Sequence, residues 1–197
     1  LQVLTARQEV NPAIKIINMS RRFGAGPCVL AGFKHSSGDA VIYMDSDLQD
    51  PPELIPSLID KWREGNDIVH TTRVNRLGES RFKMWITKGA YRVIDLLSEV
   101  KIPRNTGDFK LLSRRAVDTV LEIKESDPFV RGLSLWVGYR QISVPYERQA
   151  RHAGQTHYSM LSSINPYAEF IRGVTAFSSV PLYLALIVGF VVSLGAF

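Results

Sequence analysis

Two aspartates separated by one residue, Asp45 and Asp47, carry the strongest chemical signal in this 197-residue chain. They follow the apolar run from Ala40 to Met44, a pattern typical of a buried parallel strand, and ligands of parallel sheets bind beyond the carboxyl ends of the strands. Two carboxylates that face the same way repel each other unless a cation binds between them, and Mg²⁺ and Mn²⁺ prefer such oxygen ligands. The spacing therefore predicts a divalent-metal site, with a pair of solvated loop aspartates as the alternative.

A third carboxylate in the same stretch has a structural explanation. Asp50 precedes Pro51, and Glu53 stands three residues later, which is the pattern of a helix start. We expect Asp50 to cap this helix, which would run to about Glu64 and end at Gly65.

Strands and helices alternate along most of the chain, which predicts an α/β fold with a mostly parallel sheet and helices on both faces. The strands are expected at Ile14–Asn18, Ala40–Met44, Asp67–Thr72, Asn105–Leu112 and Gln141–Arg148. The helices are expected at Gly26–Ser37, Asp50–Glu64, Ser80–Ser98, Arg114–Ile123 and Phe129–Trp136.

The last seventeen residues, Pro181 to Phe197, contain no charged side chain. As a helix they would extend roughly 25 Å, slightly less than the ~30 Å hydrocarbon core of a bilayer. We expect a membrane-spanning helix, with a buried core helix as the alternative. Arg151 and Arg172 precede it, so the positive-inside rule places the preceding domain in the cytoplasm. Because the chain begins at Leu1 and stops within this run, we expect an internal fragment of a longer protein.

The overall charge limits the classes of partner. Net charge is +5, from 24 basic and 19 acidic residues, which falls short of the dense basic stripe of a nucleic-acid-binding protein. A mild basic excess suits a protein that holds phosphates or lies against anionic lipid headgroups. The single cysteine, Cys28, cannot form an internal disulfide.

Three blocks of sequence, in order, resemble the family 2 glycosyltransferases that load sugars onto polyprenyl phosphates. The blocks are VIYMDSDLQDPPE (41–53), NTGDFKLLSRRAV (105–117) and RGLSLWVGYRQISVPYERQARHAG (131–154). The resemblance is greater to bactoprenol glucosyltransferases than to dolichol-phosphate mannose synthases, and it covers nearly the whole chain. It implies a GT-A fold, in which a Rossmann-like domain binds a nucleotide sugar. Arg131 and Trp136 belong to the third block, and Trp136 is expected in the core.

The resemblance also implies a domain organisation. Residues 1–157 would form the GT-A catalytic domain, without the first nucleotide-binding strand that the family carries ahead of this region. Residues 158–179 would form an amphipathic juxtamembrane helix, and residues 180–197 the first transmembrane helix of a multi-pass protein in the cell (inner) membrane. We expect this fragment alone to be inactive, because its donor site would be incomplete.

On the donor side, the resemblance assigns Asp45, Asp47 and Gln49 to a Mg²⁺ or Mn²⁺ ion. The ion would bind the diphosphate of the nucleotide sugar and neutralise the leaving nucleotide. Asp47 is therefore expected to be a catalytic residue. Asp108 is the second expected catalytic residue, as an orienting or electrostatic group near the acceptor, and a turn aspartate after Gly107 is the alternative.

On the acceptor side, the expected substrate is a lipid phosphate. Its second pKa lies near ~6, so at neutral pH it is already a nucleophile and needs cations more than a general base. The resemblance assigns these contacts to Arg73, Lys83, Thr87 and Arg151, with solvated surface charges as the alternative. Lys83 and Thr87 lie four residues apart and so share a helix face. The family carries arginine and serine at these two positions, and lysine at His157, so the chain departs from the pattern there.

Together these features predict an inverting transfer of a hexose, glucose from UDP-glucose, to undecaprenyl phosphate at the cytoplasmic membrane face. The partners would be the nucleotide sugar, the polyprenyl phosphate lipid and the membrane, without nucleic acid, and a homo-oligomer stays open. One alternative is a non-catalytic membrane adaptor on a GT-A scaffold that binds polyprenyl phosphate or a partner transferase, although the retained Asp45 and Asp47 argue against it. The other is a fragment of a processive polysaccharide synthase, although the Gln-x-x-Arg-Trp block usual in that group is not found.

Overall fold

The computed structural model describes residues 2–47, 49–74, 106–125, 128–147, 171 and 175–195. The strands are β1 (Ala40–Tyr43), β2 (Ile68–Arg73), β3 (Thr106–Ser113) and β4 (Gln141–Tyr146). The helices are α1 (Gln2–Val10), α2 (Ala25–His35), the 3-10 turn η1 (Pro52–Leu54), α3 (Ile55–Arg63), α5 (Arg114–Glu122), α6 (Val130–Trp136) and α8 (Val180–Gly195). The predicted helix at 80–98 and most of the predicted juxtamembrane helix at 158–179 lie outside the described residues.

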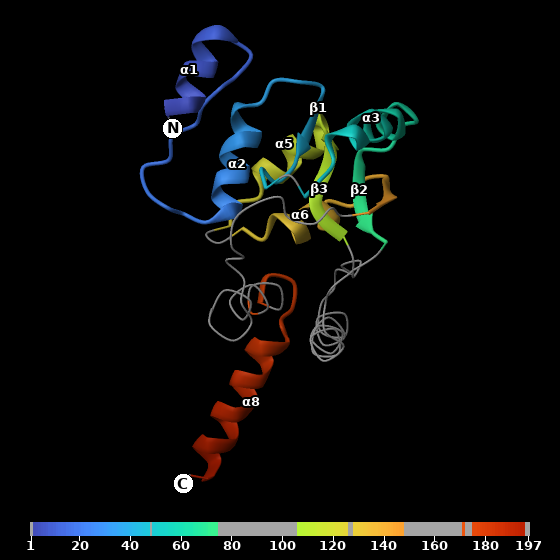
Figure 1. The fold of residues 1–197 in the computed structure, drawn as a ribbon. Helices are drawn as coiled ribbons and strands as arrows, with labels where there is room; N and C mark the ends of the chain where they lie inside the picture. The colour runs from blue at the N-terminus through green and yellow to red at the C-terminus, as the bar shows by residue number, and fades with distance from the viewer. Residues whose placement is uncertain are drawn as a thin grey trace.

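The four described strands form one mixed sheet in the order β1-β3-β2-β4 (Figure 1). β2 and β4 are parallel, whereas β3 runs antiparallel to both of its neighbours, β1 and β2. The prediction of an α/β fold is therefore confirmed, and the prediction of a mostly parallel sheet is wrong for the hydrogen-bonded pairs. The physical reason is that a continuous apolar run reports burial on both faces of a strand, and not the direction of that strand.

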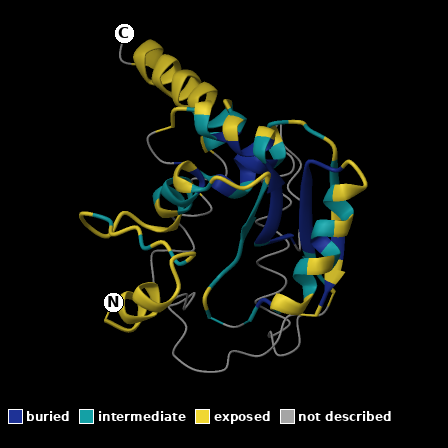
Figure 2. Cartoon of the chain, turned by 90° about the horizontal axis from the view of Figure 1, so that it is seen from above, coloured by how far each residue is buried: buried dark blue, intermediate teal, exposed yellow. Residues whose placement is uncertain are grey.

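Helices cover both faces of the sheet, as predicted, and each face has its own apolar core. On one face α3 packs against the strands, and the buried residues there are Leu58, Val69, Phe109, Leu111 and Val144. On the other face lie α2, α5 and α6, and the buried residues there include Phe33, Ile68, Leu112, Val117, Val120 and Leu133. Figure 2 shows buried strands between more exposed helices. The two layers hold the strand ends in fixed positions.

Several local predictions are corrected. Residues 14–18 form no strand, because most of them are exposed and none of the described strands pairs with them, and the sequence prediction missed α1. Pro51, rather than Asp50, is the residue before η1, and Asp50 instead accepts a hydrogen bond from the Tyr146 hydroxyl at 2.7 Å. A buried bond to a carboxylate is stronger than an exposed cap, so the distant partner prevails. Trp136 is 56% exposed and does not belong to the core.

α8 is an apolar helix of 16 residues that extends away from the sheet (Figure 1). Its large side chains are exposed, among them Leu182, Leu186, Phe190 and Leu194. Within the part of the chain that the structure describes, no helix is both long and apolar enough to span a membrane. The predicted transmembrane helix at 180–197 is therefore not confirmed, since the described helix extends only about 24 Å.

The ring of Phe177, in the segment before α8, packs against α6. Phe177 is 8% exposed, and its ring lies 6.3 Å from the ring of Phe129, measured between centroids. The ring occupies the space beside Gly132, where a Cβ atom would lie 2.1 Å from a ring carbon of Phe177. Only a residue without a side chain allows α6 and Phe177 to approach this closely.

A buried histidine gives the fold a pH dependence. His70 on β2 is 2% exposed, and its Nε2 lies 2.8 Å from Gln141 Oε1. The pKa of His70 is lowered from 6.5 to about 4, first by burial and then by the positive charge of Lys110, against the raising effect of the hydrogen bond to Gln141. The ring is therefore neutral in the folded protein at pH values where the unfolded chain is protonated.

We expect the free energy of unfolding to fall as pH decreases from 6.5 toward 4. Across this interval the unfolded chain takes up a proton at His70 and the folded chain does not, so the full contribution of about 3 kcal/mol exists only above pH 6.5. Urea denaturation at pH 7.0 and pH 4.5, on the wild type and on His70→Gln, measures it. The variant should lose most of the pH dependence in this interval, and equal slopes for the two proteins would contradict the assignment.

Candidate active site

Three strand ends and one strand start meet at a single edge of the sheet. β1, β2 and β4 point the same way and end at this edge, and β3, which runs the opposite way, begins there. Tyr43 pairs with Lys110, and continuing that register by two residues brings the position of Asp45 beside that of Asp108. If β3 were parallel to β1, Asp108 would lie at the opposite edge of the sheet. The antiparallel strand therefore unites two carboxylates that are distant in sequence.

Charges from several segments act on one phenol at this edge. Burial raises the pKa of the Tyr43 hydroxyl, and the negative charges of Asp108 and Asp45 raise it further. The positive charge of Arg131 lowers the same pKa, and the negative charge of Asp50 raises it. The hydroxyl of Tyr43 is thus protonated at neutral pH, in an environment made by three carboxylates.

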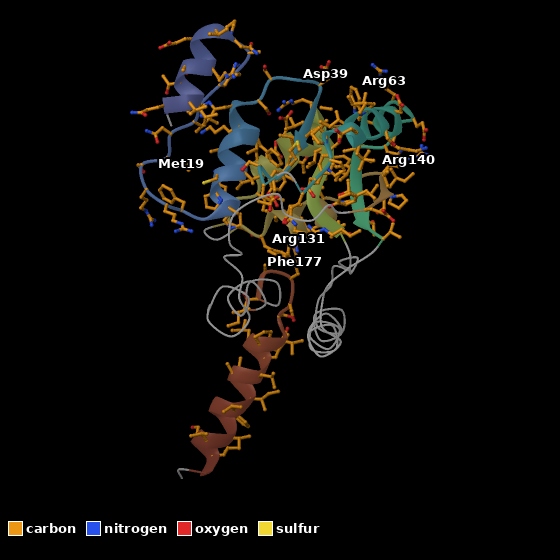
Figure 3. The ribbon with its side chains drawn as sticks, in the orientation of Figure 1. Met19, Asp39, Arg63, Arg131, Arg140 and Phe177 are labelled. Carbon is orange, nitrogen blue, oxygen red and sulfur yellow. The ribbon has the colours of Figure 1, made fainter. Side chains whose placement is uncertain are left out.

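Asp108 is held in a two-point ion pair with Arg131 of α6. Figure 3 shows Arg131 at the opposite end of the sheet from Asp39. Arg131 Nε donates to Asp108 Oδ1 at 3.0 Å, and Nη2 donates to Oδ2 at 2.5 Å. Burial raises the pKa of Asp108, but the charge and hydrogen bonds of Arg131, with the charges of Lys110 and Arg73, lower it below the ordinary value. The carboxylate is therefore ionised and already engaged, which suits an electrostatic group better than a proton acceptor.

A buried cation supports this carboxylate from within the sheet. Lys110 lies two residues after Asp108 on β3, and its fully buried ammonium donates to Ser134 Oγ at 3.0 Å. The pKa of Lys110 is lowered to about 8, mainly by burial; the charge of Asp108 opposes this decrease and the charge of Arg131 contributes to it. The ammonium form of Lys110 favours the ionised form of Asp108.

Arg73, the last residue of β2, lies at the same edge. Its Nε donates to Tyr146 Oη at 3.3 Å, and the Tyr146 hydroxyl donates to Asp50 Oδ1 at 2.7 Å. Gly107 lies next to both side chains, and a Cβ atom there would be in ordinary van der Waals contact with them, 3.4 Å from Arg73 Nη2 and 3.5 Å from Tyr146 Oη. An arginine in this position can bind a phosphate group with paired donors.

The loop after β1 contains the predicted metal ligands. Asp47 Oδ1 accepts a hydrogen bond from the Gln49 backbone N–H at 3.2 Å, which closes a tight turn. Asp45, Asp47 and Gln49 are all half-buried. Among the described residues, no group of three or more His, Cys, Asp and Glu side chains is arranged to hold a metal ion. The metal assignment stays a prediction that depends on ligands from the substrate.

The structure brings part of the predicted site together. Asp45, Asp108 and Arg73, predicted from separate parts of the sequence, lie at one edge of the sheet. The other predicted acceptor contacts lie outside the described residues, and they are Lys83, Thr87 and Arg151.

Two partners at this edge were not assigned to the site from sequence. The sequence indicates Arg131 only as a member of the third resembling block, and it assigns no role to Tyr146. The partner of each is far away in the chain, 23 residues for the pair with Asp108 and 96 residues for the pair with Asp50. In the sequence, Tyr146 is only a tyrosine within the predicted strand Gln141–Arg148.

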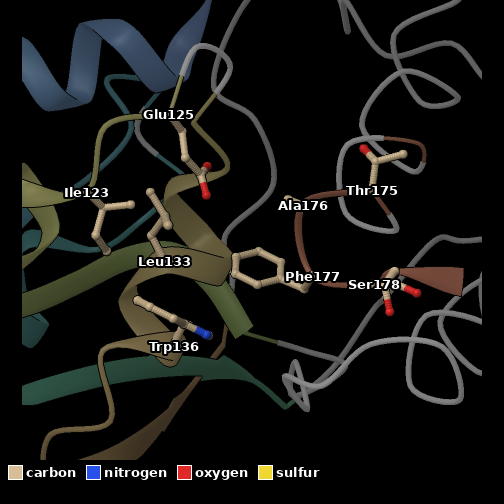
Figure 4. Close-up of a pocket in the computed structure, with 9 residues that line it drawn as sticks. Ile123, Glu125, Leu133, Trp136, Thr175, Ala176, Phe177 and Ser178 are labelled. Atoms are coloured by element: carbon tan, nitrogen blue, oxygen red, sulfur yellow. The ribbon is translucent and has the colours of Figure 1, made fainter. Parts of the chain in front are cut away.

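A pocket of about 350 Å³ lies elsewhere, between α6 and the segment before α8 (Figure 4). Leu133 and Trp136 contribute its α6 side, and Phe177 projects toward them from the opposite segment. Glu125 also lines it. None of the predicted site residues lines this pocket, so the chemistry suggested by the sequence belongs to the edge of the sheet.

The sequence matches known proteins over most of its length. The family model described as "Glycosyl transferase family 2" matches residues 1–121. An uncharacterized glycosyltransferase from Synechocystis sp. is 45% identical over 184 residues, which are 93% of this chain and 57% of that protein. A prophage bactoprenol glucosyl transferase homolog from Escherichia coli is 36% identical over 195 residues, 99% of this chain and 63% of that protein. The bactoprenol glucosyl transferase of Shigella phage SfV is 36% identical over 191 residues, 97% of this chain and 61% of that protein.

The chain spans about 57% to 63% of the length of these curated relatives. Among solved structures, a complex of glucosyl-3-phosphoglycerate synthase from Mycobacterium tuberculosis has a TM-score of 0.46 and 22% identity, and covers 86% of this chain and 57% of that chain. A likeness of that size supports no conclusion about this protein. The family model is different, because it matches more than half of the residues. The chain therefore belongs to glycosyl transferase family 2.

Proposed function

We propose that the protein transfers a hexose, glucose from UDP-glucose, to the phosphate of a polyprenyl lipid such as undecaprenyl phosphate. The observation that carries this proposal is the meeting of Asp45, Asp108 and Arg73 at one sheet edge in a member of a glycosyltransferase family. Relatives named bactoprenol glucosyl transferases, at 36% identity, support glucose as the sugar and a polyprenyl acceptor. Because those relatives are longer than this chain, the activity is proposed for the whole protein.

The reaction would proceed by a single displacement with inversion. An oxygen of the lipid phosphate attacks the anomeric carbon, the bond from that carbon to UDP breaks, and UDP departs with the electron pair. The lipid phosphate is mostly dianionic at neutral pH, since its second pKa lies near ~6, so no side chain needs to remove a proton from it. The protein must instead bring two anions together and stabilise positive charge on the sugar ring.

Asp45, Asp47 and Gln49 would hold a Mg²⁺ or Mn²⁺ ion on the donor side. Their carboxylate and amide oxygens are ligands that these cations prefer, and one or two carboxylates suffice for Mg²⁺ where substrate phosphates complete the shell. When bound, the ion neutralises the charge of the departing diphosphate. The hydrogen bond between Asp47 and Gln49 keeps the loop in a shape that presents both residues.

Asp108 would act on the sugar ring and Arg73 on the acceptor. The ionised carboxylate of Asp108, oriented by Arg131, would stabilise the positive charge that develops at the anomeric carbon. The guanidinium of Arg73 would bind the lipid phosphate and offset its repulsion from the sugar diphosphate. Because the acceptor is a lipid, the reaction would take place at a membrane surface, and we propose the cytoplasmic face, where UDP-glucose is available.

The transfer reaction itself is the first test. The full-length protein, purified in detergent, is incubated with radiolabelled UDP-glucose, undecaprenyl phosphate and Mg²⁺ or Mn²⁺, and the lipid fraction is counted. We expect label in the lipid, dependent on the divalent cation and abolished by EDTA. Protein that binds the lipid phosphate without releasing UDP would favour the adaptor alternative instead.

We expect Arg73→Ala to raise KM for undecaprenyl phosphate at least about tenfold and to change KM for UDP-glucose less than about twofold. The reason is that a charge-assisted pair with phosphate is lost on the acceptor side alone. Steady-state kinetics with each substrate varied in turn give both constants. Arg63→Ala, an exposed arginine at the end of α3, is the matched control and should leave both constants unchanged. Equal increases in the two KM values for Arg73→Ala would contradict the assignment.

A further inference from the structure

One tyrosine stands between the loop of the predicted metal ligands and the predicted acceptor arginine. Tyr146 ends β4 and is 5% exposed. Its ring meets the ring of Phe109 edge-on, with centroids 6.2 Å apart and an interplanar angle of 85°. Its backbone carbonyl accepts a hydrogen bond from the Val74 N–H at 3.0 Å. The ring is therefore fixed by contacts that do not involve its hydroxyl.

The hydroxyl of Tyr146 has one proton, and that proton is directed to Asp50. The distance from Oη to Asp50 Oδ1 is 2.7 Å, and Asp50 is 1% exposed. With the proton given to Asp50, the lone pairs of Oη are available to a donor, and Arg73 Nε donates to it at 3.3 Å. By accepting the proton of the Tyr146 hydroxyl, Asp50 determines the direction from which this hydroxyl can accept a hydrogen bond.

This contact constrains how Arg73 presents its other donors. A guanidinium is planar and carries five N–H donors in a fixed fork, one on Nε and four on the terminal nitrogens. With Nε engaged by Tyr146, rotation of the guanidinium is restricted. One N–H of Nη2 lies on the same side as Nε–H, so three of the four remaining donors point away from Tyr146. Gly107 adds no side chain at this point, and a Cβ there would lie 3.4 Å from Arg73 Nη2.

We propose that Tyr146 is a positioning residue that orients Arg73 toward the acceptor phosphate, and that Asp50 holds Tyr146 in the orientation required. This inference rests on the proposed function, in which Arg73 binds the lipid phosphate. Asp50 lies three residues after Asp47, at the end of the loop of the predicted metal ligands. The same hydrogen bonds therefore keep the donor loop and the acceptor arginine in a fixed mutual position.

The experiment compares Arg73→Ala, Tyr146→Phe and the double variant in the full-length protein. We expect Tyr146→Phe to raise KM for undecaprenyl phosphate about fivefold to tenfold, with kcat and KM for UDP-glucose within about twofold of wild type. The double variant should match Arg73→Ala within about twofold, because a positioning residue acts only through the group that it positions. A structural role alone would lower the thermal midpoint without separating the two KM values.

Two further variants keep the test decisive. Tyr139→Phe removes another partly buried hydroxyl, which pairs with Thr119 at 2.8 Å on the α5 side, and it should leave both KM values unchanged. Asp50→Asn preserves the shape of the side chain but offers N–H donors that compete with Arg73 for the tyrosine oxygen, so it should also raise KM for the lipid phosphate. This variant carries the test if Tyr146→Phe does not fold.

The outcomes separate the two hypotheses. If Arg73→Ala raises KM for the lipid phosphate while Tyr146→Phe and Asp50→Asn leave it unchanged, the positioning role is overturned and the proposed function survives. A double variant that is much worse than Arg73→Ala would also overturn it, because Tyr146 would then act independently. If Arg73→Ala itself has no effect on that KM, the acceptor assignment fails and the positioning role fails with it.

Discussion

Asp47→Asn should lower kcat/KM for glucose transfer at least about 100-fold, which corresponds to about 2.7 kcal/mol of lost transition-state stabilisation. Asparagine has the shape of aspartate, and its Oδ1 can still accept the Gln49 N–H that closes the loop, so the turn should persist. The substitution removes one negative charge from the predicted metal ligands, and weaker metal binding leaves the departing UDP without compensation. Initial rates measured over a series of Mn²⁺ and Mg²⁺ concentrations should show a higher metal requirement for the variant.

Asp60→Asn provides the matched control for this prediction. Asp60 is an exposed aspartate on α3, on the surface of the same domain, and the substitution should leave the rate and the metal requirement unchanged. Transfer at the wild-type rate by Asp47→Asn would refute the metal assignment. A reduced rate with an unchanged metal requirement would refute it equally, since the lost charge would then act on something other than the cation.

The second large effect is expected for Asp108→Asn, with kcat reduced about 100-fold to 1000-fold. The carboxylate of Asp108 is ionised and paired with Arg131, and its neutral substitute cannot stabilise positive charge on the sugar ring. Arg131 would at the same time lose the negative charge that compensates it. Binding of anionic substrates should therefore not weaken, and KM for the lipid phosphate should stay at or below the wild-type value.

A second arginine–aspartate pair gives the control for this prediction. Asp118 on α5 lies 3.6 Å from Arg114 Nη1, and its side chain is 57% exposed. Asp118→Asn should leave kcat within about twofold, because an exposed ion pair contributes little. An unchanged kcat for Asp108→Asn, in protein shown by its thermal midpoint to be folded, would eliminate the electrostatic role of Asp108.

Most elements of the fold could be predicted because their signals are local. The apolar run that became β1 and the end of α3 before Gly65, which has a φ of 91°, are both explained by a few neighbouring residues. The direction of β3 could not be predicted in this way. The direction of a strand depends on the end of the sheet from which the chain enters it. The residues of Thr106–Ser113 themselves, whether apolar or turn-forming, do not determine that end.

The residues of the candidate site also differ in whether a local sequence signal or a distant partner explains them. Asp45, Asp47 and Arg73 could be proposed from the sequence because each closely follows or ends a strand, where ligands of such sheets bind. Asp108 was identified by resemblance alone, since it stands near the start of its strand and reaches the site only through the reversal of β3. The sequence around Asp50 has the pattern of a helix cap. In the structure the Asp50 carboxylate instead accepts a hydrogen bond from Tyr146, which lies 96 residues away in the chain.

Arg131 and Gly132 are consecutive residues of α6, and they serve two different neighbours. The first holds the carboxylate of Asp108, and the second accepts the ring of Phe177 at a distance that excludes any side chain. A displacement of the ring would press on the same helical turn that carries the guanidinium. Mechanical load applied along α8 would therefore be transmitted through one helical turn to the proposed active site.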